Sequence, residues 1–196
     1  HFLDAEAVVT PVSSNTVAER SAWFPRVERT RIGSPYVIAG MLALRESDVD
    51  RIVGYEANGG FLTLSAIQQD GRELAPLPTR DAMIVAVAIL LLADRRGVPV
   101  SQLAGLLPAR FTASDRLQSF PTDISQARIA AMIEHPGEVA KLLPELGEPS
   151  QVDTTDGLRM TFPNDEIVHL RPSGNAPELR CYTEADTVTR ARDLNR

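Results

Sequence analysis

The chain has 196 residues, of which 43% are hydrophobic and 23% are charged, which is typical of a soluble globular protein with one large or two small domains. Its formal net charge of -6 at pH 7 argues against nucleic acid as the main partner, because no basic stripe is available to neutralise phosphates. An anionic small molecule is compatible with this charge, since a few arginines placed together make a positive pocket on an acidic protein.

Three features bear on the cellular setting of the chain. Cys181 is the single cysteine, so no intrachain disulfide can form and we expect a reducing cytoplasm. The longest apolar run, residues 82–93, is shorter than the roughly 20 residues of a membrane span, and residues 1–12 lack the features of a signal peptide. The chain begins on a strand-like pattern and ends in a charged segment, so we expect a fragment of a longer protein without a membrane partner.

Residues 1–108 alternate strand-like and helix-like patterns, which predicts a three-layer α/β domain with a mixed sheet. The expected strands are 6–12, 27–32, 50–56 and 61–67. The expected helices are 16–24, 36–46, one that starts at Thr79 or Asp81 and is closed by residues 95–97, and 101–107. The third of these helices is apolar all round, so we expect it to be buried, with Gly97 at its end. Ser34 stands where it could cap the second helix.

Residues 109–196 predict a smaller α+β domain, with a four-stranded antiparallel sheet and helices on one face. The expected strands are 150–155, 158–162, 166–171 and 178–185, with turns at residues 156–157 and 164–165, and the expected helices are 124–135, 137–143 and one that starts near 186. Residues 108–123 are polar, bounded by prolines and aperiodic, so we expect them to connect the two domains.

The segment RPSGNAP, residues 171–177, places an arginine and small polar residues between two expected strands. Its backbone N–H groups can form a concave nest for phosphate oxygens, Ser173 and Asn175 add donors, and the planar fork of Arg171 suits two contacts with a phosphate. Gly174 permits a close approach or a positive φ angle. A loop of this composition is more often a plain turn, so the residues alone leave both interpretations open.

The segment GYEANGG, residues 54–60, follows another expected strand. Glu56 can accept hydrogen bonds from two adjacent sugar hydroxyls, Asn58 can donate and accept, and two glycines leave the approach open. The strand that comes next favours a hairpin with an Asn-Gly turn instead. The two interpretations are compatible, because binding residues often lie on tight loops held by a rigid sheet.

The two loops together resemble those of a known family. RPSGNAPELRCYTEA resembles the phosphate-binding loop of the α-D-phosphohexomutase superfamily, and GYEANGG resembles its sugar-binding loop, in the same order and at a similar separation. TRIGSPYV and LPTRDA also resemble family segments, so the resemblance covers nearly the whole chain and is closest to bacterial phosphomannomutases. Members of the family have four domains, and this chain is similar to the third and fourth.

The resemblance implies roles for particular residues. It assigns sugar hydroxyls to Glu56 and Asn58, and it assigns the substrate's phosphate to Arg171, Ser173, Gly174 and Asn175. Many relatives have Thr-Glu-Pro where this chain has Asn-Ala-Pro at 175–177, which is a departure from the family pattern. Arg31 and Ser34 are further candidates, because some members place a histidine near Ser34, although we prefer a helix cap for that serine.

Nothing in the chain resembles the family's phosphorylated serine loop or its aspartate-rich metal loop. Asp153 and Asp156 fit hairpin positions, and the histidines show no metal-ligand spacing, so we expect no catalytic residue and no metal ligand here. The Mg²⁺ of the full-length enzyme would be bound elsewhere. His169 shares a strand face with Arg171 but has the pattern of a structural histidine, and Cys181 alternates into the core.

The function implied by the resemblance is that of an isomerase of carbohydrate metabolism. The full-length phosphomannomutase would interconvert mannose 6-phosphate and mannose 1-phosphate through an enzyme phosphoserine and a hexose 1,6-bisphosphate. This chain would bind the phosphorylated hexose, would need the N-terminal domains of the same protein as partners, and would be inactive alone. The alternatives are a fragment of a phosphoglucomutase or phosphoglucosamine mutase, or a non-catalytic phosphosugar-binding module.

Overall fold

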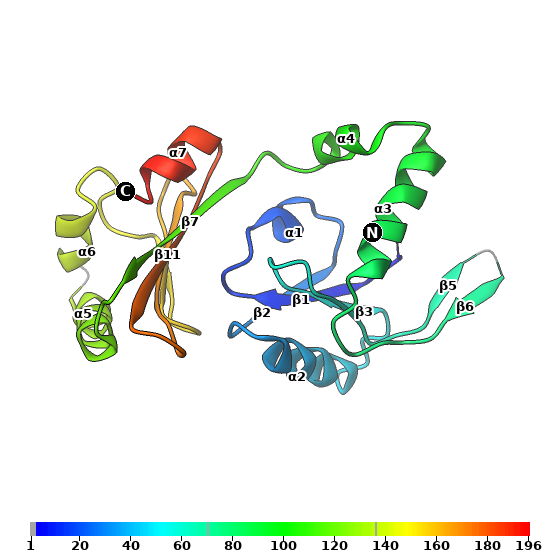
Figure 1. Ribbon diagram of the computed structural model, residues 1–196, viewed down its shortest axis with the longest axis horizontal. Helices are drawn as coiled ribbons and strands as arrows, with labels where there is room; N and C mark the ends of the chain where they lie inside the picture. The colour runs from blue at the N-terminus through cyan, green and yellow to red at the C-terminus, as the bar shows by residue number, and fades with distance from the viewer. Residues whose placement is uncertain (1–2, 70, 136) are drawn as a thin grey trace. The chain divides into compact units, whose positions relative to one another are not determined.

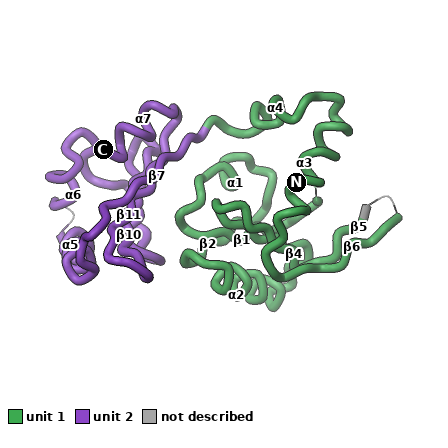
Figure 2. The backbone as a smooth tube through the Cα atoms, in the orientation of Figure 1, with its two compact units in different colours: residues 1–109 green, residues 110–196 purple. Residues whose placement is uncertain are grey.

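The computed structural model describes residues 3–69, 71–135 and 137–196 of the chain. The chain forms two compact units, residues 1–109 and residues 110–196 (Figure 2). Each unit has its own sheet and its own buried core, and each is described separately below.

Unit 1 is built on a four-stranded mixed sheet, as predicted (Figure 1). Its strand order is β2 (Arg26–Thr30), β1 (Ala7–Pro11), β3 (Ile52–Tyr55) and β4 (Phe61–Thr63). The first three strands are parallel, and β4 is antiparallel to β3. All five residues of β1 are buried, as is typical of a central strand in a sheet that is covered on both faces.

One helix packs on one face of this sheet, and a second helix faces the other side across a cavity. On one face, α2 (Ser34–Arg45) packs Val37, Met41 and Leu44 against alternate residues of β1. On the other face, α3 (Met83–Arg96) lines a cavity of about 230 Å³ together with Val8 and Val53 of the sheet. A short helix, α1 (Val17–Arg20), connects β1 with β2.

The expectation that Ser34 caps α2 is wrong. The helix begins at Ser34, the capping position belongs to Gly33, and no side chain makes a capping hydrogen bond. The backbone N–H groups of Tyr36 and Val37 donate to the carbonyl of Gly33 at 3.0 and 3.3 Å, so the first turn closes one residue earlier than predicted. Ser34 therefore lies inside the first turn, where it does not satisfy the end of its own helix.

The expectation of a buried helix that starts at Thr79 or Asp81 is also wrong in part. The helix forms, Asp81 accepts the N–H groups of Met83 and Ile84, and Gly97 ends the helix in the left-handed conformation as predicted. However, Met83 is 71% exposed and Leu90 is 61% exposed, because the sheet covers only one side of α3. An all-round apolar pattern shows what a helix would bury, but not whether a neighbouring element covers it.

The rest of unit 1 consists of small elements. Strands β5 (Ile67–Gln69) and β6 (Arg72–Leu74) form a separate hairpin, and α4 (Val100–Leu103) precedes a 3-10 turn, η1 (Ala104–Leu106). None of the helices within the described ranges is both long and apolar enough to cross a membrane.

Unit 2 contains a five-stranded antiparallel sheet, so the expectation of four strands is wrong. The order is β7 (Phe111–Gln118), β11 (Glu178–Ala185), β10 (Ile167–Pro172), β9 (Leu158–Thr161) and β8 (Gln151–Asp153). The additional strand, β7, lies in the segment expected to be a connection, and it pairs with β11 along its whole length. It was missed because it is an edge strand with exposed side chains, which weakens the alternation that reveals a strand.

Three helices pack on one face of this sheet. Ile129 of α5 (Thr122–Glu134) and Val139 of α6 (Gly137–Leu142) pack with Val168 and Leu170, and α7 (Val188–Asp193) packs Ala191 against the end of β11. Because side chains alternate along a strand, His169 and Arg171 of β10 point to the opposite face. We call this opposite side of the sheet the open face.

A buried arginine joins the start of β7 to the rest of unit 2. The guanidinium of Arg110 donates to Glu184 at 2.6 Å, to Asp186 at 2.5 Å and to the carbonyl of Asp165 at 2.6 Å. The Arg110 side chain is 1% exposed, so these acceptors replace water around the charge.

Candidate functional site

In unit 1, the candidate residues lie at the carboxyl edge of the parallel strands. Glu56 comes directly after β3, and Arg31 and Ser34 come directly after β2, which runs in the same direction. Ligands of open α/β sheets bind outside this edge, where the connections leave a crevice. Topology therefore brings these residues to the end of the sheet at which a ligand is expected.

The loop of residues 56–60 is a tight hairpin between β3 and β4, as predicted. The N–H of Glu56 donates to the carbonyl of Gly60 at 2.8 Å, and the N–H of Gly59 donates to the carbonyl of Glu56 at 3.0 Å. The Asn58 side-chain oxygen accepts the N–H of Gly60 at 3.1 Å. Asn58 is exposed, so its side-chain amide is accessible to a ligand as a donor.

The Glu56 carboxylate is the unusual group in this loop. Glu56 is 8% exposed, and its Oε1 atom is buried without a hydrogen bond. The Nε atom of Arg80 lies 3.7 Å away, which is ion-pair distance but too long for a hydrogen bond. Since buried polar atoms nearly always have a partner, this oxygen is an acceptor available to a hydroxyl.

Arg80 is a residue that the sequence did not single out. Its side chain is 52% exposed, and a Cβ atom at Gly60 would lie 2.8 Å from its Nε atom, so the glycine leaves room for the guanidinium beside Glu56. The signal that could have found it is the segment LPTRDA, which contains Arg80.

Arg31 and Ser34 lie at the same sheet edge but make different contacts. The guanidinium of Arg31 stacks on the ring of Tyr36, 5.1 Å from its centroid, and the Arg31 residue is exposed. Across the described residues, no hydrogen bond or ion pair joins either of them to Glu56. Their participation in binding stays a prediction.

In unit 2, the loop of residues 173–177 connects β10 with β11. The N–H of Ser173 donates to the carbonyl of Glu178, and the N–H of Glu178 donates to that of Ala176, both at 2.8 Å. The hydroxyl of Ser173, which is 3% exposed, accepts the N–H of Asn175 at 3.4 Å. These contacts hold the backbone of the loop in place.

This loop presents donors to solvent. Within the described part of the chain, the N–H groups of Gly174 and Ala176 make no hydrogen bond, and Gly174 and Asn175 are exposed. Gly174 does not have a positive φ angle, so the glycine is not required by backbone conformation. A Cβ atom at Gly174 would meet nothing within 4 Å, which leaves space for an incoming ligand.

Arg171 lies at the end of β10 on the open face of the sheet. Its Nε atom donates to Oδ1 of Asp156 at 2.9 Å, and its side chain is 17% exposed. Among the described residues, its two terminal nitrogens have no hydrogen-bond acceptor. The side of the guanidinium that can bind an anion bidentately is therefore available.

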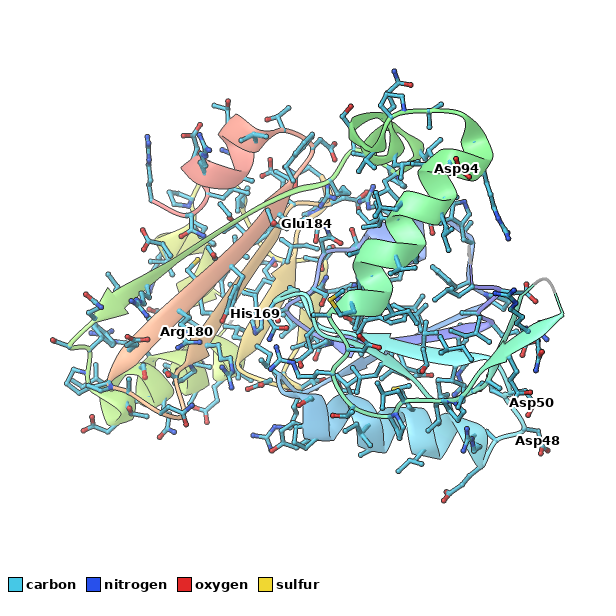
Figure 3. The ribbon with its side chains drawn as sticks, turned by 45° about the vertical axis from the view of Figure 1, so that its right-hand side comes forward. Asp48, Asp50, Asp94, His169, Arg180 and Glu184 are labelled. Atoms are coloured by element: carbon cyan, nitrogen blue, oxygen red, sulfur yellow. The ribbon has the colours of Figure 1, made fainter. Side chains whose placement is uncertain are left out.

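Arginines of neighbouring strands stand next to Arg171 on the open face. Arg171 pairs across the sheet with Arg180, which pairs with Arg116 on β7. Glu178 offsets part of this charge, with oxygens 3.3 Å from Arg180 and 3.4 Å from Arg116. Figure 3 labels His169 on β10, and Arg180 and Glu184 on β11. The sequence did not single out Arg180 or Arg116, because strand pairing brings them to Arg171.

The two loops differ in what they offer to a ligand. The loop at 56–60 presents a carboxylate oxygen, which accepts hydrogen bonds from hydroxyls. The loop at 173–177 and Arg171 present N–H donors and positive charge, which suit a phosphate. No cluster of three or more His, Cys, Asp or Glu side chains that could hold a metal ion occurs in the residues that the structure describes.

Comparison with known proteins places both units in one family. A sequence model of the phosphoglucomutase/phosphomannomutase α/β/α domain III matches residues 2–111, and one of the C-terminal domain of the same family matches residues 125–196. A phosphomannomutase of Salmonella muenchen is 44% identical over 186 residues, and one of Sinorhizobium fredii is 39% identical over 193 residues.

These relatives are much longer than the chain. The aligned residues cover 94% of this chain and 38% of the Salmonella protein, and 98% of this chain and 40% of the Sinorhizobium protein. A solved phosphoglucomutase/phosphomannomutase family protein from Burkholderia thailandensis shares the fold, with a TM-score of 0.66 at 19% identity over 96% of this chain and 36% of that structure. The chain belongs to the phosphoglucomutase/phosphomannomutase family and matches its domain III and its C-terminal domain, which confirms the resemblance noted from the two loops.

Proposed function

We propose that this chain supplies the substrate-binding half of a phosphomannomutase. The observation that carries the proposal is the division of chemistry between the loops: donors around Arg171, and a buried acceptor without a hydrogen bond at Glu56. A phosphohexose has the complementary division, with hydroxyls on the ring and a phosphate at one end. The preference for mannose follows the names of the two relatives that are 39% and 44% identical.

In the proposed reaction, an enzyme phosphoserine outside this chain transfers its phosphoryl group to the free hydroxyl of a mannose phosphate. The serine P–O bond breaks and a P–O bond to the sugar forms, while the sugar hydroxyl loses its proton and the serine oxygen gains one. The hexose 1,6-bisphosphate then returns its other phosphoryl group to the serine, with the opposite exchange of a proton. Phosphoryl transfer leaves the protein mainly positioning and electrostatic work. The residues of this chain do the positioning and none of the bond making.

Each loop has its own task in this scheme. Arg171, Ser173, Gly174 and Asn175 hold the phosphate that does not react. Glu56 and Asn58 hold ring hydroxyls in both orientations of the sugar, because a carboxylate and an amide can bind either pair of neighbouring hydroxyls. Arg31 and Ser34 would add charge and polarity at the sheet edge. The residues described here do not fit a Mg²⁺ site, so we place Mg²⁺ in the remaining part of the enzyme, and no step of this scheme passes through it.

Calorimetry with mannose 1-phosphate tests the binding assignment. Arg171→Ala should weaken binding at least about tenfold, since a charge-assisted contact to phosphate contributes roughly 1.5–3 kcal/mol. Arg192→Ala is the matched control, because it removes an equal charge from an exposed position on α7. Equal affinities of the Arg171 variant and the unchanged chain would contradict the assignment.

Activity measurements separate the alternatives. The chain alone should show no mutase turnover, because the proposed serine and metal loops lie outside it, and turnover by the chain would contradict this scheme. The longer protein should turn over mannose phosphates faster than glucose or glucosamine phosphates, and the reverse order would indicate a phosphoglucomutase or phosphoglucosamine mutase. Phosphosugar binding without turnover in the longer protein would indicate a binding module.

A further inference from the structure

The turn between β8 and β9 makes two contacts with β10, and both are made by Asp156. Oδ1 of Asp156 accepts the Nε–H of Arg171 at 2.9 Å. The backbone carbonyl of Asp156 lies 2.6 Å from Nε2 of His169, two residues earlier on the same strand face. One residue of the turn therefore binds both polar side chains that β10 directs to the open face at this end of the strand.

Gly157 allows the turn to come this close. A Cβ atom at position 157 would lie 2.3 Å from the carbonyl oxygen of Leu170 and 3.0 Å from Cα of Arg171. Real Cβ atoms essentially never lie closer than 3.0 Å to such an atom, so the contact with the Leu170 carbonyl excludes a side chain at position 157. The φ angle of +88° is also unfavourable for residues other than glycine. The turn therefore rests directly on the backbone of Arg171, which fixes the distance from Asp156 to the guanidinium.

His169 holds the backbone carbonyl of the same residue, Asp156. It is 1% exposed, and its burial lowers the pKa of the imidazole, so the ring is neutral at pH 7. Because a carbonyl oxygen only accepts hydrogen bonds, Nε2 carries the proton and donates it to Asp156. The ring also lies against Tyr182, with 5.4 Å between the ring centroids, so it is packed in one orientation.

We infer that Asp156, held by Gly157 and His169, is a positioning residue that fixes the guanidinium of Arg171 for phosphate binding. The inference rests on the proposed function, in which Arg171 holds the phosphate. Asp156 occupies the Nε–H on one side of the guanidinium and leaves the two terminal nitrogens to the ligand. The side chains of Asp156 and Arg171 are 10% and 17% exposed, so water competes little for their contact.

A negative charge beside a phosphate site has an opposing effect that makes the inference testable. The Asp156 carboxylate repels a phosphate and lowers the local positive potential. If this repulsion dominated, removal of the carboxylate would strengthen phosphate binding. If positioning dominates, removal weakens binding, because an arginine that is free to move loses its alignment with the ligand.

The ligand-free test measures the contact itself. In ¹⁵N NMR spectra of the 196-residue chain, the Arg171 Nε–H signal should exchange slowly with water. Asp156→Ala should collapse this protection, and Asp156→Asn should keep most of it, because the asparagine oxygen still accepts the Nε–H. Asp153→Ala is the matched control, since Asp153 belongs to the same hairpin and its side chain accepts the N–H of Thr155. Unprotected Nε–H in the unchanged chain would overturn the inference.

The ligand test measures affinity for mannose 1-phosphate and for inorganic phosphate, with the melting temperature recorded for every variant. Asp156→Ala should weaken both affinities at least about tenfold. Asp156→Asn should stay within about threefold of the unchanged chain, because it keeps the acceptor and removes the repulsion. Tighter binding by a folded Asp156→Ala variant, or equal losses in the Asn and Ala variants, would overturn the inference.

The two proposals can fail separately. If Arg171→Ala binds phosphate as well as the unchanged chain does, the proposed function fails. If Arg171→Ala loses binding while a folded Asp156→Ala retains it, only the positioning role fails.

Discussion

The two candidate loops have opposite chemistry, and they differ in how a glycine takes part. Gly59, at φ +90°, belongs to the loop at 56–60, whereas Gly157, at φ +88°, belongs to the separate turn between β8 and β9 that contacts Arg171. At 56–60 the loop holds a buried carboxylate oxygen that has no hydrogen bond. At 171–177 the exposed groups are donors, and Asp156 in the turn between β8 and β9 accepts the Nε–H of Arg171.

This difference shows where each loop is constrained. A Cβ atom at Gly59 would meet nothing within 4 Å, so that turn needs glycine only for its backbone angle. A Cβ atom at Gly157 would collide with the backbone of the neighbouring strand. The turn at Gly59 therefore needs no neighbouring backbone to hold its shape, whereas the site around Arg171 is assembled from two turns that must pack together.

The largest expected effect is that of Gly157→Ala. The added methyl group must push the turn away from β10, and overpacking together with an unfavourable φ angle should cost about 3 kcal/mol or more of unfolding free energy. Gly59→Ala, with the same φ angle and open space, should cost only about 1–2 kcal/mol. Urea denaturation of both variants measures this comparison, and similar losses would show that the turn at 157 is not in close contact.

The next largest effect is that of Glu56→Gln on sugar binding. The neutral amide should weaken mannose 1-phosphate binding by about tenfold, since it replaces a charged acceptor of hydroxyl hydrogen bonds. The affinity for inorganic phosphate should not change, because Glu56 does not contact the phosphate in the proposed site. Calorimetry with both ligands checks the result, and Glu46→Gln, at an exposed position beyond α2, is the control. An equal loss for both ligands would contradict the separation of roles.

A smaller effect concerns the pH dependence of stability. Burial lowers the pKa of His169 in the folded chain below its unfolded value near 6.5, so between these two values the unfolded chain binds more protons. The contribution of His169 is therefore fully present above about pH 6.5 and falls as the pH decreases towards the folded pKa.

His169→Gln should reduce the loss of unfolding free energy between pH 7 and pH 5. The difference in slope should be at most about 1.4 kcal/mol per pH unit, which corresponds to one proton. Urea denaturation at several pH values measures the slope, and His135→Gln, at an exposed position, is the control. An unchanged slope in the His169 variant would contradict the assignment of a buried neutral imidazole.

The sequence predicted the elements that have strong local signals. The alternation of β10 and β11, the Asp-Gly and Asn-Gly turns and the mixed sheet of unit 1 follow from local patterns, and the family resemblance singled out the two loops. Edge strand β7 was missed because exposed side chains do not alternate in polarity. The exposure of α3 was missed because an apolar pattern does not specify which neighbours cover it.

The residues missed around the candidate site have a common physical reason. Arg80 approaches Glu56 from a segment more than 20 positions later, and Asp156 approaches Arg171 from another turn. Arg180 and Arg116 join Arg171 through strand pairing. Such contacts depend on tertiary register, which local composition does not encode.

The most direct test of the central claim is a pair of NMR titrations of the chain, with mannose 1-phosphate and with inorganic phosphate. We predict that mannose 1-phosphate shifts the amide signals of residues 58–60 and 174–176 with a single dissociation constant, and that inorganic phosphate shifts only those of 174–176. Two different dissociation constants for the loops, or shifts in neither loop at saturating ligand, would contradict the claim that one phosphosugar is bound by both.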